Sequence, residues 1–140
     1  MLQVKNEAIV NLVTFLEKLE LTPKASRVRT KLNKLLGSKV EELYKDEMDL
    51  LDRFGKKDEA GKLIQSEGAY SLIEDTALNY HQEKAELLSE IIHIEVRELH
   101  EKLPVLIEEL ENSEEKLSGQ QAEIFDDLMD LLEDELKKNT

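Results

Sequence analysis

The sequence predicts a mostly α protein: a long antiparallel helical hairpin, C-terminal helices packed back on it, and either a small β-hairpin or a three-stranded insertion between them. Apolar residues recur at three- and four-residue spacing over most of the chain, which is typical of amphipathic helices. Hydrophobic residues make up 40% and aromatic residues only 4%, so we expect leucine and isoleucine to form the core. The length fits a single domain over residues 1–140.

The predicted hairpin covers residues 6–54. Its first helix spans residues 6–20, and Pro23 then suits the first turn of a second helix, because proline fixes φ and lacks a backbone N–H. Helical periodicity continues to Gly55, which gives a helix of ~30 residues and ~45 Å. Gly37 is its weakest point, since glycine costs about 1 kcal/mol relative to alanine in a helix, and this allows a bend or break there.

Residues 55–75 are predicted to form a loop or β excursion. Short apolar pieces flank the turn-forming sequence Gln-Ser-Glu-Gly at residues 65–68, which indicates a small hairpin. A lone hairpin is only marginally stable, so it needs a third strand or a helix to lie on. Residues 91–96 are rich in isoleucine and valine and are one candidate for that strand. They also fit the continuation of a helix that begins at Thr76, and periodicity leaves both alternatives open.

Residues 76–138 are predicted to be mainly helical. The first helix of this segment is expected to end at Ser89, and another to begin or kink near Pro104. The last helix has the clearest signal, because Ser118 and Gln121 form a capping-box pattern ahead of a leucine-rich stripe. We expect these helices to pack their apolar stripes on the hairpin.

Acidic residues outnumber basic ones by 32 to 19, which gives a formal net charge of −13. This charge disfavours direct binding to nucleic acids and to anionic membranes. The charges are unevenly spread: residues 1–40 carry a net charge of +5, residues 41–94 of −8 and residues 95–140 of −10. Either the basic stretch packs against acidic helices of the same fold, which we favour, or two surfaces of opposite sign face different partners.

Several function classes lack a sequence signal. The chain has no cysteine, which excludes disulfides, thiolate metal sites and cysteine nucleophiles. It contains no Walker loop, G-x-G-x-x-G or G-x-S-x-G motif, so we expect no catalytic residues and no cofactor. No apolar run reaches the ~20 residues of a membrane span and the first residues lack a signal-peptide core. We therefore expect a cytoplasmic protein without membrane contact.

Two pairs of acids are candidate metal ligands. Glu83 with Glu86 and Glu123 with Asp126 have the spacings with which all-helical nucleotide pyrophosphohydrolases hold magnesium, because residues three apart share one helix face. Random placement of 32 acids in 140 positions already gives about seven such pairs. We therefore expect no metal site, and we keep a magnesium-dependent all-α nucleotide pyrophosphohydrolase as an alternative function.

Two charged helix faces are candidate partner-binding surfaces. The acids of the last helix present carboxylates that can imitate a phosphate backbone and meet a basic protein surface. The selected acids are Glu123, Asp126, Asp127 and Asp130. Bases of the second helix recur at i, i+3, i+7 and i+10. As a functional surface, their face suits contact with phosphate or an acidic protein; we favour the alternative of a solvated helix face or pairing with the C-terminal acids. These bases are Lys24, Arg27, Lys31 and Lys34.

Three parts of the sequence carry a resemblance to a known family. They are ASRVRTKLNKLL at residues 25–36, the pieces Glu41-Glu42-Leu43, Asp46-Glu47, Leu50-Leu51 and GKKDEAG within residues 41–61, and KLSGQQAEIFDDL at 116–128. These stretches resemble a family of small proteins, of unknown function, from tailed phages and prophages of Gram-positive bacteria. The resemblance implies a phage setting and carries over no functional residue. Small acidic phage proteins often bind host proteins, so the resemblance favours an interaction role.

We therefore expect a non-enzymatic acidic phage accessory protein in the host cytoplasm. It binds a host or defence protein, as an inhibitor with a nucleic-acid-like acidic surface. The alternatives are the nucleotide pyrophosphohydrolase and a virion or assembly component. The sequence leaves open whether the protein forms a homo-oligomer, because the long helix can bury its apolar stripe within the chain or against a second copy.

Overall fold

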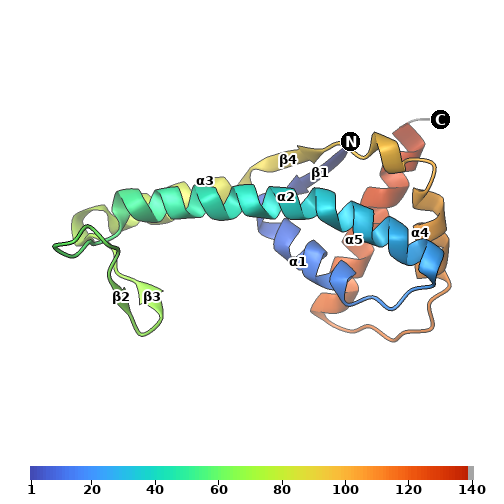
Figure 1. Cartoon of the computed structure of the whole chain (residues 1–140), viewed down its shortest axis with the longest axis horizontal. Coiled ribbons are helices and arrows are strands. Elements are labelled where there is room, and N and C mark those ends of the chain that lie inside the picture. The colour runs from blue at the N-terminus through green and yellow to red at the C-terminus, as the bar shows by residue number, and fades with distance from the viewer. Residues whose placement is uncertain (139–140) are drawn as a thin grey trace. The chain divides into compact units, whose positions relative to one another are not determined.

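The computed structural model describes residues 1–138 (Figure 1). Within this range the helices are α1 (Asn6–Glu17), α2 (Pro23–Phe54), α3 (Ala77–Ser89), α4 (Leu103–Glu111) and α5 (Gln120–Lys138). The strands are β1 (Leu2–Lys5), β2 (Gln65–Ser66), β3 (Ala69–Tyr70) and β4 (Ile91–Ile94), and single 3-10 turns cover Glu74–Thr76 and Arg97–Leu99. The predicted mostly α fold class with a small β-hairpin is confirmed.

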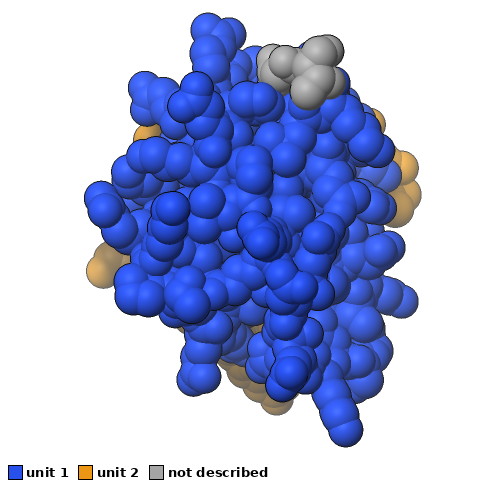
Figure 2. All heavy atoms as spheres, turned by 90° about the vertical axis from the view of Figure 1, so that its right-hand side faces the viewer, with its two compact units in different colours: residues 1–40, 91–140 blue, residues 41–90 orange. Residues whose placement is uncertain are grey.

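The chain divides into two compact units, coloured separately in Figure 2. Unit 1 contains residues 1–40 and the described residues from 91 onward, and unit 2 is Glu41–Glu90. Helix α2 contributes to both, since it continues through Val40 without interruption.

The core of unit 1 is aliphatic and follows the predicted periodicity. Its buried side chains recur every three or four residues on four helices, so each helix turns one apolar stripe inward. Burying each leucine contributes about 1.5–3 kcal/mol relative to leaving it exposed. The most completely buried large side chains are Ile9, Leu16, Leu32, Leu36, Val96, Leu103, Leu106, Leu128 and Leu132.

Strand β4 pairs with β1, which corrects one prediction and adds an element that sequence reasoning missed. Residues 91–96 do not continue a helix, and they are not the third strand of a hairpin insertion. The pairing is antiparallel, with Leu2 opposite Ile94 and Val4 opposite Ile92. Leu2, Val4 and Ile94 are buried, so the paired strands contribute one apolar face to the core of unit 1.

The hairpin within residues 55–75 forms in unit 2 as strands β2 and β3. Its two-residue turn consists of Glu67 and Gly68, both with positive φ (53° and 82°), as a type I′ turn requires. The alternative of a three-stranded insertion is wrong, because β2 and β3 form a two-stranded sheet in the described residues. Instead, the chain just after α2 lies beside the hairpin stem: Lys56 N–H donates to the Ser71 carbonyl at 2.8 Å, and Ile64 N–H donates to the Lys56 carbonyl at 2.9 Å.

Arg29 stabilises the packing of α2 on α1 where the chain reverses its direction. From α2, its Nη1 donates to the carbonyls of Leu16 (2.7 Å) and Leu19 (2.8 Å) at the end of α1. The last carbonyls of a helix have no partner within it, and a cation there also opposes the negative end of the helix dipole. Asn33 Nδ2 adds a weaker bond to the Val13 carbonyl at 3.3 Å. The predicted antiparallel arrangement of the first two helices therefore has a polar as well as an apolar cause.

We expect Arg29→Ala to lower the free energy of unfolding by about 1.5–3 kcal/mol, because two carbonyls lose charged donors. Arg27→Ala is the matched control: Arg27 is exposed on the same helix, and its loss is expected to change stability by less than about 0.5 kcal/mol. Urea denaturation followed by circular dichroism measures both. Equal effects of the two substitutions would contradict the role of Arg29.

Helix α2 passes through Gly37 without a break, although this glycine would allow one. A Cβ at Gly37 would meet nothing within 4 Å, whereas a Cβ at Gly55 would lie 2.5 Å from the Leu51 carbonyl oxygen and 2.6 Å from a Leu63 methyl carbon. Gly55 therefore allows a close approach of the backbone where α2 ends, and Gly37 is only a cost to the helix.

Gly37→Ala is expected to stabilise the protein by about 1 kcal/mol, because alanine loses less backbone entropy in a helix. Gly55→Ala is expected to destabilise it by about 1–3 kcal/mol through overpacking against backbone. Thermal unfolding of the two variants beside the parent chain measures both signs. A destabilised Gly37→Ala variant would show that the glycine is needed at that position.

Candidate binding surfaces

Unit 1 contains an acidic groove of about 490 Å³. One wall is formed by β1 and the first turns of α1, and the other by α5. Its apolar lining includes Val4 and Leu12, which are buried, and Ile124 and Leu131, which are half-buried. Its carboxylates are Glu7, Glu123, Asp127, Asp130 and Asp134, and Lys5 is the basic residue of the lining.

The groove follows from the two faces of α5. Leu128 and Leu132 are four residues apart and fully buried, so they fix which side of the helix faces the core. The acids at 123, 127, 130 and 134 have i, i+4, i+7, i+11 spacing, which places them on a common face away from that core. The core packing of α5 thus aims a row of carboxylates along the groove.

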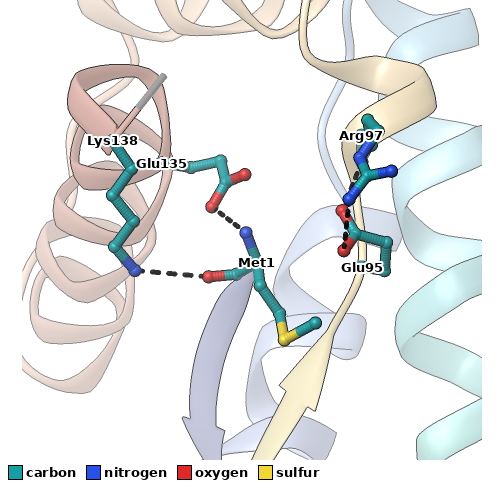
Figure 3. Close-up of polar contacts among 5 residues, drawn as sticks. All are labelled: Met1, Glu95, Arg97, Glu135 and Lys138. Atoms are coloured by element: carbon teal, nitrogen blue, oxygen red, sulfur yellow. Dashed lines mark hydrogen bonds and ion pairs between the residues drawn. The ribbon is translucent and has the colours of Figure 1, made fainter. Parts of the chain in front are cut away.

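A polar clasp joins the start of β1 to the end of α5 (Figure 3). The Met1 ammonium donates to the carboxylate of Glu135, a residue that is only 2% exposed, and Lys138 Nζ donates to the Met1 carbonyl at 3.3 Å. A buried carboxylate is costly without a partner, so Glu135 favours this placement of the strand. The clasp therefore holds β1 against α5, the two walls of the acidic groove.

The structure brings together most of the predicted acidic partner-binding residues. Glu123, Asp127 and Asp130 line the acidic groove, whereas Asp126 is exposed on α5 outside its lining. Sequence reasoning missed Glu7, and it placed Asp134 among the C-terminal acids without selecting it as a site residue. The 4-3-4 spacing on α5 was a signal for Asp134, but Glu7 joins only through the contact of α1 with α5.

The predicted basic residues separate in a similar way. Lys24, Arg27 and Lys31 line a second pocket of unit 1, together with Lys102, which sequence reasoning missed. Lys34 is exposed but does not line this pocket. The favoured interpretation, in which the basic stretch packs against acidic helices of the same fold, stays a prediction. None of these four residues forms an ion pair with an acid within residues 1–138.

The four candidate metal ligands are divided between the units. Glu83 and Glu86 lie on α3 in unit 2, and Glu123 and Asp126 lie on α5 in unit 1. Over the described part of the chain, no three His, Asp or Glu side chains are grouped closely enough to hold a metal ion.

Unit 2 has an acidic cleft of about 170 Å³ around Glu83 and Glu86. The other carboxylates of its lining are Asp46 and Asp49 from α2 and Glu90 after α3, and no lysine or arginine is among its described lining residues. Like charges at such spacings repel, so the cleft destabilises unit 2 slightly.

We expect the double substitution Glu83→Gln/Glu86→Gln to stabilise α3 by about 0.3–0.5 kcal/mol per repulsion removed. Added salt is expected to reduce the difference by screening. Amide hydrogen exchange of α3 measures the effect, with Glu59→Gln, an exposed loop residue outside the cleft, as control. Destabilisation by the double substitution would show that the two acids make a favourable contact.

Unit 2 also exposes large apolar side chains: Leu78 is 69% exposed, Tyr44 53% and Met48 44%. Exposed apolar patches mark interaction surfaces. The open prediction of a homo-oligomer therefore has candidate contact residues here, and it stays a prediction. In the described residues no helix is long and apolar enough to cross a membrane.

The fold and its surfaces define a mostly α-helical protein whose candidate sites are open pockets of opposite charge on unit 1. The chain belongs to the family described as "Protein of unknown function (DUF1617)", whose match covers residues 1–139. A search of curated proteins and a search of solved structures each find no match.

Proposed function

We propose that this protein is a non-enzymatic phage accessory protein that binds a basic segment of a host or defence protein in its acidic groove. The observation that carries the proposal is the combination of an apolar lining with a row of carboxylates in one groove of about 490 Å³. The setting in a phage of Gram-positive bacteria, and the host cytoplasm as location, rest on the resemblance of the three sequence stretches above.

The lining indicates the chemistry of the occupant. Leu12, Ile124 and Leu131 offer apolar contact area, which favours a partner segment with leucine-, isoleucine- or aromatic-type anchors. The carboxylates around them favour lysine and arginine beside those anchors and disfavour acidic partners. An amphipathic basic helix combines both features, and binding of such a helix in a groove is a common mode of peptide recognition.

The row of acids on α5 is less densely charged than a nucleic acid. Its four acids run from Glu123 to Asp134, eleven helical steps apart, so neighbouring acids are spaced by about 5.5 Å along the helix axis. One strand of duplex DNA carries a charge about every 3.4 Å. The row is sparser than a phosphate backbone, so the apolar lining must supply part of the affinity. An inhibitory role against a nucleic-acid-binding protein then requires that protein to present apolar anchors among its basic residues.

The test uses the tagged chain and lysates of a Gram-positive bacterium with and without phage infection. Partners are identified by mass spectrometry and then measured as purified proteins. Substituting Glu123, Asp127 and Asp130 by lysine is expected to weaken binding at least about tenfold and to flatten its salt dependence, because electrostatic complementarity is reversed. Asp126→Lys is the matched control, since Asp126 lies on the same helix outside the groove lining.

The three groove substitutions are also made one at a time, for comparison with the single control. Binding in the groove would be contradicted if Asp126→Lys weakened the affinity as much as each of them. Recovery of phage structural proteins alone would favour the virion or assembly role instead. Turnover of a nucleoside triphosphate in the presence of Mg²⁺, lost on Glu83→Gln or Glu123→Gln substitution, would favour the hydrolase alternative.

A further inference from the structure

The second pocket of unit 1, of about 350 Å³, gathers four cations. Lys24, Arg27 and Lys31 come from one face of α2 at i, i+3 and i+7, and Lys102 comes from the residue preceding α4. Pro23, Val28 and Val105 complete the lining with apolar surface. We call this site the basic pocket. It shares no residue with the acidic groove, so the two sites are tested independently.

These cations lack acidic partners in a chain with many acids. Among residues 1–138, the ion pairs with defined distances join Met1 to Glu135, Lys57 to Asp52 and Arg97 to Glu95, and none involves the basic pocket. Glu109 accepts the Thr22 N–H with both carboxylate oxygens at 3.1 Å, directly before α2 begins. Four convergent cations without an ion-paired acid favour an anionic ligand.

Two of the cations are close enough to disturb one another. The pKa of Lys31 lies below its ordinary value, first because of the neighbouring Lys102 side chain and its charge, and then because of desolvation and the charge of Arg27. Glu98 acts in the opposite direction and is the smallest of these causes. A bound anion would compensate this repulsion.

We propose that the basic pocket binds a small molecule carrying two or more linked phosphate groups, with Lys24, Arg27, Lys31 and Lys102 as its ligands. Phosphate matches the set because each group presents several strong acceptor oxygens, and Arg and Lys are the side chains that recognise it. One phosphate carries at most about two negative charges against four cations, so linked phosphates, and a triphosphate above all, match the charge of the set better. The net charge of −13 repels a long polyanion over the whole surface, while a compact anion interacts mainly with the local cluster.

The experiment titrates the intact protein with inorganic triphosphate, with ATP and with orthophosphate in isothermal calorimetry. Triphosphate is expected to bind more tightly than orthophosphate. Equal affinity for triphosphate and ATP indicates recognition of phosphate alone, and tighter binding of ATP indicates that Val28 and Val105 contact the organic part. Both results support the site and distinguish the two sources of the phosphate chain.

The pocket variant is Lys31→Gln/Lys102→Gln, which removes two charged hydrogen-bond donors and is expected to weaken triphosphate binding at least about tenfold. It also removes the mutual repulsion of the pair, so it is expected to unfold no more easily than the parent chain. Lys18→Gln/Lys116→Gln is the matched control, because it changes the net charge equally at exposed residues outside the pocket. The control is expected to change affinity less than twofold.

Equal weakening in both double variants would overturn the proposal, because it would show attraction to general surface charge. Absence of binding heat and of chemical-shift changes at Val28 and Lys31 with millimolar triphosphate would overturn it as well. Tighter binding of a single-stranded oligonucleotide than of triphosphate would replace the small-molecule ligand by a nucleic acid. The failure of the acidic groove to bind any protein leaves each of these results unchanged.

Discussion

Pairing of β1 with β4 is the constraint on which unit 1 depends. It places Leu2 opposite Ile94, two residues that are far apart in the sequence, and the side chains of Leu2, Val4 and Ile94 are all buried. The same pairing, with the clasp between Met1 and Glu135, places β1 beside α5 and thereby forms one wall of the acidic groove. The four-residue strand is too short to be stable alone, so its position depends on this burial and on the hydrogen bonds of the ladder.

The second organising feature is the helical period itself. On α2 and α5, leucines at three- and four-residue spacing face the core, and this leaves the intervening positions to charged residues. On α2 the exposed residues are basic near its start, and on α5 they are acidic along its length. The opposite charges therefore form separate surfaces on unit 1. Arg29 is the exception, because it donates to the carbonyls of Leu16 and Leu19 instead of facing solvent.

The helices could be predicted from the sequence because their signals are local: a proline near the start of α2 and α4, and regular apolar spacing in each. The partner of β4 could not, since four residues starting at Leu2 carry too little pattern to select a strand some 90 positions away. The same distinction applies to the sites. The sequence selects Asp126 together with Asp127 and Asp130, because all three fit helical spacing from Glu123, and only the structure places Asp126 outside the groove lining. Lys102 likewise joins the basic pocket only through tertiary packing.

Like charges converge in the acidic groove and in the basic pocket of unit 1, and their repulsion lowers the stability of the free protein. Carboxylates at i and i+4 on α5 repel by about 0.2–0.5 kcal/mol per pair, and Lys31 opposes Lys102 in the basic pocket. A ligand of opposite charge removes this cost on binding, so it gains affinity without a new protein contact. The cleft of unit 2 has the same kind of repulsion. Its volume of about 170 Å³ leaves far less room for a partner segment. The like charge of each lining therefore supports the acidic groove and the basic pocket of unit 1 as the proposed binding sites.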